Sequence, residues 1–495
     1  MYSSHSGVEF TPREEAGTFD VTVDCGVSPG PILARAWNGE GASAPVALMI
    51  SGDPQTAEQE PNDNFSDPQQ VQGPSASING CLDKSDDIDS YRIFITEGTY
   101  LIARVEAYVL AAGADTMLRV LDPRGTVVAF NHDGPANMDP LLVFEAPESG
   151  KYVVQIMGHK YPAGSDIRFQ GGQDCVYRLH LNTGPVLRNP WPLAISPSGS
   201  PADPAGTAEG WNLTDGPSSF DPAGRWIFSF PVSGGAEWTE ESTHGNCTIP
   251  SAVSGRISAP GEEDRYSFSM EKDESVQLAV TGPAHGSAID AWLKVLDANG
   301  KELAANDDGA ESLDPELVFK APESGVYTAV TGDLTQRGGP GYYYRLQFGR
   351  PLPAVKAVAS GHSYTLAAGA TSEIKVTVTP GHGFGVPLQL KAEDLPSGVS
   401  APAVPVPEKG GETVLTLTSE KSSAPAGKPI RLVLVEAPGG REHPVVYEMI
   451  SSSLNNGVPQ GYQQLLINDT TGIWLTVLPP APPPAPQEEK PKESD

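Results

Sequence analysis

Two short acidic segments carry the residues of this chain whose types and spacing could do chemistry. The first, residues 58–63, reads Glu-Gln-Glu-Pro-Asn-Asp, and the second, residues 86–89, reads Asp-Asp-Ile-Asp. Carboxylates and an asparagine amide are oxygen donors, and a hard cation such as Ca²⁺ takes six to eight oxygens. Acidic clusters more often just stay solvated. Cation binding and simple solvation are therefore both open interpretations at this point.

Motifs for other chemistries are absent from the sequence. The chain contains no His-Glu-x-x-His, no Gly-x-Ser-x-Gly and no Cys-x-x-Cys, which disfavours a zinc protease, a serine hydrolase elbow and a structural zinc site. Asn131-His-Asp-Gly134 and Asn306-Asp-Asp-Gly309 predict hairpin turns, because the full spacing of a calcium loop and its closing glutamate are missing. We therefore expect that the chain is not an enzyme.

The elements that must position the acidic residues belong to a module that the chain contains twice. Residues 131–152 and 306–327 match in one register, 175 positions apart, and the same interval relates Tyr91 to Tyr266. So constant an interval over so long a run indicates a duplicated domain. Within each copy, apolar residues at alternate positions predict half-buried strands, and Asp-x-x-Gly sequences at 122–125 and 297–300 predict hairpins.

Length and composition predict several all-β domains. A chain of 495 residues exceeds a single core, and 53 Gly with 48 Pro favour short strands and many turns. The predicted fold class is all-β, with tandem β-sandwiches. The predicted domains are a partial immunoglobulin-like domain (1–52), repeat 1 (53–184), a small β domain (185–246), repeat 2 (247–350), an immunoglobulin-like sandwich (351–478) and a Pro-rich disordered tail (479–495).

The charge and the termini limit the possible partners. A net charge of −30 repels nucleic acid and anionic membranes and attracts cations. No apolar run is long enough to span a membrane, and no signal segment opens the chain, so we expect it to be part of a longer precursor. The four cysteines allow three pairings, and a Cys81–Cys175 bridge within repeat 1 is one of them.

The order of motifs in the two repeats resembles the bacterial pre-peptidase C-terminal domain. The matching motifs are Glu-x-Glu-Pro-Asn-Asp, Asp-x-Asp-x-Tyr, Leu-x-Val-Leu-Asp with a Gly turn, Asn-x-Asp-Gly, Pro-Glu-Ser-Gly-x-Tyr and Tyr-Arg-Leu. Members of that family are jelly-roll-like β-sandwiches attached to secreted proteases and surface proteins, and they are similar to the collagen-binding domains of clostridial collagenases. The flanking segments resemble immunoglobulin-like domains.

This resemblance implies a calcium site in the first repeat. In the collagenase relatives the acidic leader and an acidic pair at the first long strand bind calcium. Carried onto this sequence, the ligands come from Glu58, Glu60, Asn62, Asp63, Asp86, Asp87 and Asp89, where the spacing leaves open which of the last three form the pair. The second repeat lacks the Glu-Pro-Asn-Asp leader, so we expect no comparable site there.

Two functional expectations follow. The first is a non-catalytic secreted or cell-surface protein whose repeats bind an extracellular protein or polysaccharide or act as spacers, with a calcium-stabilised first repeat. The second is an accessory C-terminal region of a secreted peptidase whose catalytic domain is absent from this chain. Nucleic-acid binding and a membrane span are not expected.

Overall fold

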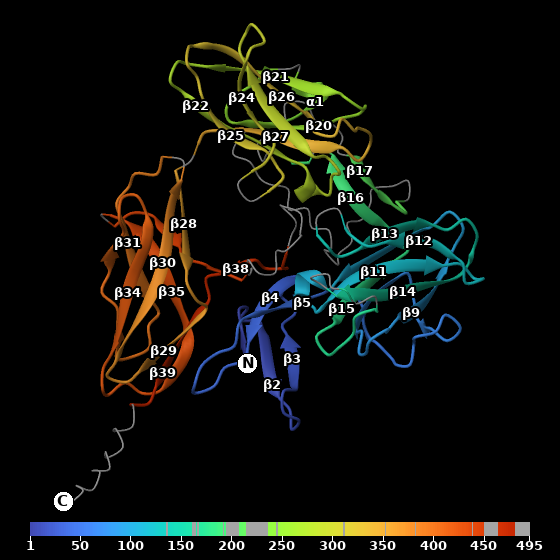
Figure 1. Ribbon diagram of the computed structural model, residues 1–495, viewed down its shortest axis with the longest axis horizontal. Helices are drawn as coiled ribbons and strands as arrows, with labels where there is room; N and C mark the ends of the chain where they lie inside the picture. The colour runs from blue at the N-terminus through green and yellow to red at the C-terminus, as the bar shows by residue number, and fades with distance from the viewer. Residues whose placement is uncertain are drawn as a thin grey trace, which may run out of the picture. The chain divides into compact units, whose positions relative to one another are not determined.

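The computed structural model describes residues 1–134, 137–160, 165, 168–191, 193–194, 207–213, 236–243, 246–309, 312–351, 353–381, 383–437, 439–449 and 464–480. Within these ranges the protein is built almost entirely of strands, as predicted (Figure 1). It divides into two compact units, one made of residues 49–352 with 450–466, the other of residues 1–48, 353–449 and 467–495.

The first repeat is a two-layer β-sandwich. Its strands are β6 (Gln55–Ala57), β7 (Gln69–Gln70), β8 (Ser75–Cys81), β9 (Asp89–Ile95), β10 (Tyr100–Glu106), β11 (Ala114–Leu121), β12 (Val127–Asn131), β13 (Leu141–Glu145), β14 (Gly150–Lys160) and β15 (Val176–Asn182), with a 3₁₀ turn at Tyr108–Leu110. One sheet has the order β13-β10-β15-β8-β6 and the other β12-β11-β14-β9-β7. All neighbours are antiparallel except the short edge strands β6 and β7, which run parallel to β8 and β9.

The second repeat has the same topology. Its elements are β18 (Ala236–Thr239), α1 (Glu240–Thr243), β19 (Asn246–Cys247), β20 (Ser251–Arg256), β21 (Glu263–Met270), β22 (Ser275–Thr281), a 3₁₀ turn (Pro283–His285), β23 (Ala291–Leu296), β24 (Glu302–Asn306), β25 (Glu316–Lys320), β26 (Gly325–Asp333) and β27 (Tyr343–Gly349). The sheet orders are β25-β22-β27-β20-β18 and β24-β23-β26-β21-β19. Strand for strand, this reproduces the first repeat, including the parallel edge strands.

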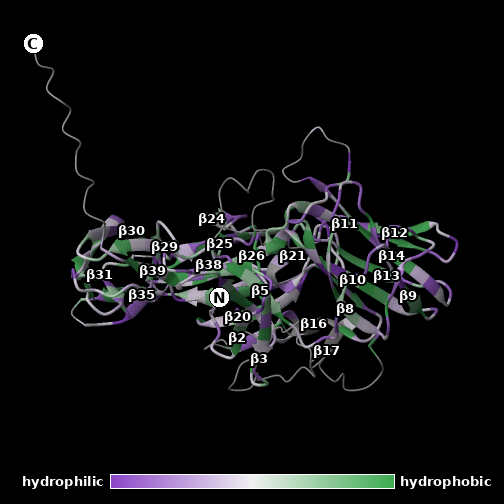
Figure 2. Cartoon of the chain, turned by 90° about the horizontal axis from the view of Figure 1, so that it is seen from below, coloured by the Kyte–Doolittle hydropathy of each residue, from purple (hydrophilic) through white to green (hydrophobic). Residues whose placement is uncertain are grey.

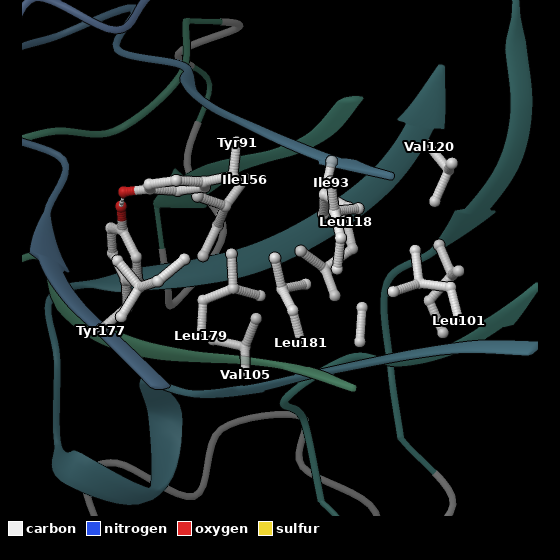
Figure 3. Close-up of a cluster of buried hydrophobic side chains, with 14 of the residues drawn as sticks. Tyr91, Ile93, Leu101, Val105, Leu118, Val120, Ile156, Tyr177, Leu179 and Leu181 are labelled. Atoms are coloured by element: carbon white, nitrogen blue, oxygen red, sulfur yellow. Dashed lines mark hydrogen bonds between the residues drawn. The ribbon is translucent and has the colours of Figure 1, made fainter. Parts of the chain in front are cut away.

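Each repeat has its own hydrophobic core between its two sheets. In β9 the alternate residues Tyr91, Ile93 and Ile95 are buried in the first core, as the apolar period predicts, while Phe94 between them is exposed. Figure 3 shows Tyr91 and Ile93 in this core together with residues of β10 and β15. Burying one such side chain contributes roughly 1.5–3 kcal/mol. No buried residue belongs to both core clusters, so each repeat has a separate interior.

The predicted hairpins occur where the Asp-x-x-Gly sequences place them. Asp122 and Gly125 close a turn between β11 and β12, in which the Gly125 N–H donates to the Asp122 carbonyl over 2.9 Å. Gly125 has a φ of 85° and Gly300, its counterpart, a φ of 81°. Because only glycine adopts this region at no steric cost, these turns are encoded by the glycines.

Between the repeats, β16 (Val186–Trp191) and β17 (Thr207–Trp211) form a two-stranded sheet. Much of the predicted small β domain, including residues 195–206 and 214–235, lies outside the described residues, as does most of the Pro-rich tail.

The C-terminal sandwich pairs a four-stranded sheet, β28-β30-β34-β32, with a larger sheet, β29-β39-β35-β31-β33, to which β36 adds. Its strands are β28 (Ala354–Ala359), β29 (Ser363–Ala367), β30 (Thr371–Gly381), β31 (Leu388–Glu393), β32 (Val399–Ser400), β33 (Val404–Pro405), β34 (Gly411–Ser419), β35 (Ala426–Glu436), β36 (Glu442–Pro444) and β39 (Ile473–Leu478), and β37 (Tyr447–Glu448) pairs with β38 (Asp469–Thr470). Figure 2 shows hydrophobic residues along these strands and hydrophilic ones on many connecting loops.

The N-terminal segment packs against this C-terminal sandwich. Its strands are β1 (Tyr2–Ser3), β2 (Val8–Pro12), β3 (Phe19–Val23), β4 (Gly30–Arg35) and β5 (Val46–Ile50). The buried Arg35 guanidinium donates to the carbonyls of His362 and Gly472, and the rings of Tyr2 and Trp37 contact Trp474 at centroid distances of 5.5 and 5.6 Å. Residues more than 300 positions apart thus share one compact unit.

Candidate metal centre

The acidic leader is held beside β9 by the path of the chain. The leader follows β6, which lies at the edge of one sheet, and precedes β7, which lies at the edge of the other. It therefore crosses from one layer of the sandwich to the other, and the crossing passes the start of β9. Asn62 fixes this crossing because its carbonyl accepts the Ser90 N–H over 3.1 Å. The two acidic segments, 23 or more residues apart in sequence, meet at this end of the sandwich.

Four carboxylates converge there. Glu60, Asp63, Asp87 and Asp89 can each place one oxygen within 4.8 Å of the others. Asp87 and Asp89 are completely buried, whereas Glu60 and Asp63 face solvent. An ion could therefore reach the group from the leader side and contact the buried oxygens behind it.

The buried members of the group are electrostatically unfavourable as charged groups. Burial, with the neighbouring Glu58 carboxyl, raises the pKa of Asp89 to about 10, and burial together with a hydrogen bond to Asp63 raises the pKa of Asp87 to about 6. Asp89 Oδ2 accepts the Tyr177 hydroxyl over 2.6 Å, but Asp89 Oδ1 has no hydrogen-bond donor. Such an oxygen costs about 1–3 kcal/mol unless something satisfies it.

The side-chain oxygen of Asn62 also lacks a hydrogen-bond donor. Asn62 is buried, and its Nδ2 donates to Glu58 Oε1 over 3.3 Å while its Oδ1 has no hydrogen-bond donor. Asn62 Oδ1 and the buried Oδ1 atoms of Asp87 and Asp89 all lack a hydrogen-bond partner. Such oxygens are the hard ligands that calcium prefers. The residues present thus fit a hard divalent cation.

Lys84 supplies a positive charge next to these carboxylates. Its ammonium lies 3.3 Å from Asp63 Oδ1, 3.4 Å from Asp87 Oδ1, 3.5 Å from Asp83 and 4.0 Å from Glu60. Half of the lysine side chain remains exposed. Because the lysine side chain is long, flexible and half exposed, its ammonium can move into solvent without disturbing the core.

The other two predicted ligands have different partners. Glu58 accepts the Cys81 N–H over 2.8 Å and the hydroxyls of Tyr91 and Tyr177 over 3.3 and 3.2 Å, so it ties the leader to the core. Asp86 adopts a left-handed conformation and accepts the Phe169 N–H, so it does not join the four carboxylates. Of the three aspartates whose assignment the spacing left open, Asp87 and Asp89 are the pair that lies beside the leader.

A tyrosine pair supports the centre from inside. The hydroxyls of Tyr91 and Tyr177 meet at 2.5 Å in the core, as Figure 3 shows. The second repeat repeats this arrangement, with Tyr266 and Tyr344 at 2.7 Å and Asp264 accepting from Tyr344 over 2.6 Å. The sequence aligns Tyr91 with Tyr266, but it does not indicate that the partner tyrosine, Tyr177 or Tyr344, donates a hydrogen bond to an aspartate.

The second repeat keeps this support but not the carboxylate group. Glu240 accepts the Arg256 N–H over 2.9 Å, as Glu58 does from Cys81, the residue in the same place. Glu262 stands where Asp87 stands and accepts the Ala259 N–H over 2.8 Å. Within the described part of the second repeat, no three acidic, histidine or cysteine side chains converge as the four carboxylates do.

A serine, a histidine and a glutamate also meet in repeat 1, but in its interior. Ser77 Oγ lies 2.8 Å from His180 Nδ1, and His180 Nε2 lies 3.4 Å from Glu106, which also pairs with Arg178 at 2.6 Å. Ser77 is fully buried. A nucleophile must reach its substrate, so this network is interpreted as the neutralisation of a buried arginine. The four cysteines, including Cys81 and Cys175, are free thiols in the structure.

Comparison with known proteins places the clearest match in the second repeat. Residues 262–330 match the family model of the bacterial pre-peptidase C-terminal domain. This pre-peptidase match begins at Glu262, the counterpart of Asp87, and so excludes the segment that corresponds to the acidic leader. The first repeat shares the strand topology of the matched repeat.

One curated relative and two solved structures are also similar to parts of this chain. The chain is 27% identical over 233 residues to a probable subtilase-type serine protease of Deinococcus radiodurans, covering 44% of this chain and 26% of that protein. The chain thus spans about a quarter of the length of the curated relative it matches. The pre-peptidase C-terminal domain of a Bacillus anthracis collagenase is 15% identical with a TM-score of 0.18, covering 21% of this chain and 92% of that domain. A periplasmic inhibitor of g-type lysozyme from Aeromonas hydrophila is 16% identical with a TM-score of 0.17, covering 26% and 98%. With TM-scores this low, neither structural likeness bears on function.

In the described part of the chain, no helix has the length and apolar character needed to cross a membrane.

Proposed function

We propose that this chain is a non-catalytic region of a secreted or cell-surface protein, built around two pre-peptidase-type repeats, of which only the first binds Ca²⁺. In this proposal the repeats bind an extracellular protein or polysaccharide and accompany a serine protease. The convergence of Glu60, Asp63, Asp87 and Asp89 on one point is the observation that carries the calcium assignment.

The donor set supports calcium over softer metals. The four side chains of the group offer carboxylate oxygens and contain no sulfur or imidazole, and the leader adds the buried Asn62 amide oxygen, which has no hydrogen-bond donor. A bound divalent cation would supply the positive charge that lets Asp87 and Asp89 ionise while buried. The protein holds these residues in place by three hydrogen bonds. The Tyr177 hydroxyl donates to Asp89, the Asp83 N–H donates to Asp87, and the Ser90 N–H donates to the Asn62 carbonyl.

The accessory role is supported by the match of residues 262–330 and by the alignment with a subtilase-type protease. The burial of Ser77 and the lack of catalytic sequence motifs favour a non-catalytic chain. The acidic charge also favours partners other than nucleic acid.

Hydrogen exchange of the full chain tests the calcium assignment. Amides of β8 and β9 should exchange more slowly in Ca²⁺ than in EDTA, and those of β20 and β21 should not change. At a calcium concentration 100 times the Kd, the gain should be about 2.7 kcal/mol. Mg²⁺ at the same concentration should protect less, because it requires a smaller octahedral site. Equal exchange of β8 and β9 in EDTA and Ca²⁺ would remove calcium from the proposal.

Binding and activity assays test the accessory role. The full chain should bind at least one member of an array of matrix proteins and polysaccharides, and it should not cleave peptide or ester substrates. Turnover that Ser77→Ala abolishes would contradict the non-catalytic assignment.

A further inference from the structure

A second cluster of metal-ligating side chains lies in repeat 1, away from the leader. Asp115, His132 and Asp133 can place one ligand atom each within 4.8 Å of one another. Asp115 lies on β11, and the other two follow the end of β12, which pairs with β11 in the same sheet. None of the three belongs to the four-carboxylate group, so this cluster is independent of the proposed function.

Asp115 is a buried carboxylate with an oxygen that no donor satisfies. The residue is 7% exposed, and its Oδ1 has no hydrogen-bond partner. Its Oδ2 lies 3.3 Å from His132 Nε2, but the Nε2 makes no hydrogen bond of acceptable geometry with any partner. The carboxylate and the imidazole thus lie 3.3 Å apart, within ion-pair distance, while Asp115 Oδ1 has no hydrogen-bond donor.

That separation is the one expected of two ligands on a single ion. Zinc binds histidine nitrogen and carboxylate oxygen at about 2.0–2.2 Å in tetrahedral sites, so that neighbouring ligand atoms are roughly 3.3–3.5 Å apart. The exposed Asp133 has its Oδ2 3.7 Å from the other ring nitrogen, Nδ1, and one of its carboxylate oxygens lies within 4.8 Å of a ligand atom of each of the other two residues. His132 is partly exposed, so an ion and a completing water can reach the cluster from solvent.

The surrounding loop holds the cluster in place. Asn131 Oδ1 accepts the Leu141 N–H over 3.1 Å, and the Gly134 N–H donates to the Asn137 carbonyl over 3.1 Å. Asp139, further along the loop, is buried and accepts three backbone N–H groups, from Ala107, Tyr108 and Val109. These hydrogen bonds hold the described residues around the cluster, and side chains held in place before binding lose less entropy when a metal binds.

We propose that Asp115, His132 and Asp133 form a binding site for a borderline divalent transition-metal ion of the Zn²⁺ type. An imidazole combined with two carboxylates suits such an ion, whereas calcium takes oxygen ligands alone. The corresponding residues of repeat 2 are Asp290, Asp307 and Asp308, so repeat 2 has no histidine at these positions. Asp290 also differs in its environment, because its N–H donates to Asp333 Oδ1 over 3.0 Å. The site is thus specific to the first repeat.

Zinc binding by the full chain tests the proposal. The protein is stripped with EDTA and placed in excess Ca²⁺, so that oxygen-only sites are filled, and is then titrated with Zn²⁺ by equilibrium dialysis with metal analysis. His132→Ala should lower the affinity of one equivalent of Zn²⁺ at least tenfold, and Asp115→Asn, which preserves the shape of the side chain, should act in the same direction. Asp307→Asn, the matched change in repeat 2, should leave zinc binding unchanged.

Cobalt provides a second readout that does not depend on stability. Co²⁺ bound through an imidazole and carboxylates should give a visible absorption band that is lost in His132→Ala and retained in Asp307→Asn. Circular dichroism and the melting temperature identify any variant that has not folded. Equal zinc stoichiometry and affinity in the wild type and His132→Ala, or a first equivalent weaker than millimolar, would overturn the proposal.

Discussion

The two repeats share a topology but balance the same buried charge from different strands. In repeat 1, Arg178 on β15 pairs at 2.6 Å with Glu106, its neighbour on β10. In repeat 2, the equivalent Arg345 pairs at 2.6 Å with Glu237 on the edge strand β18, and Thr281 stands where Glu106 would be. Gln55 occupies the place of Glu237 in repeat 1, as the register of β6 shows. In both repeats a carboxylate lies beside the buried arginine, but it comes from β10 in repeat 1 and from the edge strand β18 in repeat 2.

The acidic leader shows the opposite behaviour. Both repeats keep the glutamate that binds the backbone N–H of Cys81 or Arg256, and both keep the tyrosine pair with its aspartate. Only the first repeat adds the further acidic residues of the leader. Structural carboxylates are thus retained or replaced in both copies, whereas, among the described residues, four carboxylates gather at one point in the first copy only. This contrast separates the residues that maintain the sandwich from those that serve a ligand.

The largest expected effect comes from exchanging the charge arrangement of the two repeats. Glu106→Thr alone leaves Arg178 buried without its carboxylate and should destabilise repeat 1 by about 3–5 kcal/mol. Adding Gln55→Glu reproduces the arrangement of repeat 2 and should restore most of that loss. Hydrogen exchange of β10 and β15 measures both variants. If the double variant is no more stable than Glu106→Thr, the two arrangements are not equivalent.

Removing a buried carboxylate in each repeat should separate ligand binding from support. Asp89→Asn should abolish the protection of β8 and β9 by calcium, a loss of about 2.7 kcal/mol at 100 times the Kd. The matched control Asp264→Asn should leave the calcium response of the chain unchanged. Calorimetric titration with Ca²⁺ gives the stoichiometry directly. A calcium response that survives Asp89→Asn would mean that the ion binds elsewhere.

The metal-free repeats should differ in their dependence on pH. The pKa of Asp89 is about 10 in the folded state, far above about 3.9 in an unfolded chain, so the folded state binds the extra proton and loses stability as pH rises. Asp264, its counterpart, has a pKa of about 6. Between pH 6 and 10 the free energy of unfolding of repeat 1 should therefore fall by up to about 1.4 kcal/mol per pH unit because of Asp89. Asp264 should cause no comparable fall in repeat 2 over this range. Exchange-derived stabilities in EDTA at pH 6.5 and 8.5 measure the difference, and calcium should reduce it.

The smallest effect concerns Lys84. Its ammonium contacts three of the four carboxylates and competes with a bound cation for them. Lys84→Met keeps the aliphatic stem and should strengthen calcium binding by up to about tenfold, or 1.4 kcal/mol. Lys294→Met, an exposed change in repeat 2, is the control. Weaker calcium binding in Lys84→Met would show that the lysine supports the site instead of competing for it.

Sequence reasoning predicted the local features of the molecule and missed those that need the fold. The strands with alternating apolar residues and the glycine turns follow from spacing and residue type, and the structure confirms them; the two predicted repeats also have the same strand order. That Asp86 turns away to Phe169 depends on a left-handed residue inside a loop, which the spacing does not reveal. The proximity of Asp115 and His132, and of Arg35 and Gly472, arises from strand pairing and packing between distant segments.

The short strands on either side of the leader have a consequence for the tendency of the protein to self-associate. β6 and β7 close one edge of each sheet, running parallel to β8 and β9. An open sheet edge offers unpaired backbone groups to strands of other molecules, and this is a common route to aggregation. Because one continuous segment covers both edges, anchoring its middle secures both covers together. If the first repeat binds calcium as proposed, removing the ion would expose the edges of both sheets at once, and low calcium should promote self-association that begins at the first repeat.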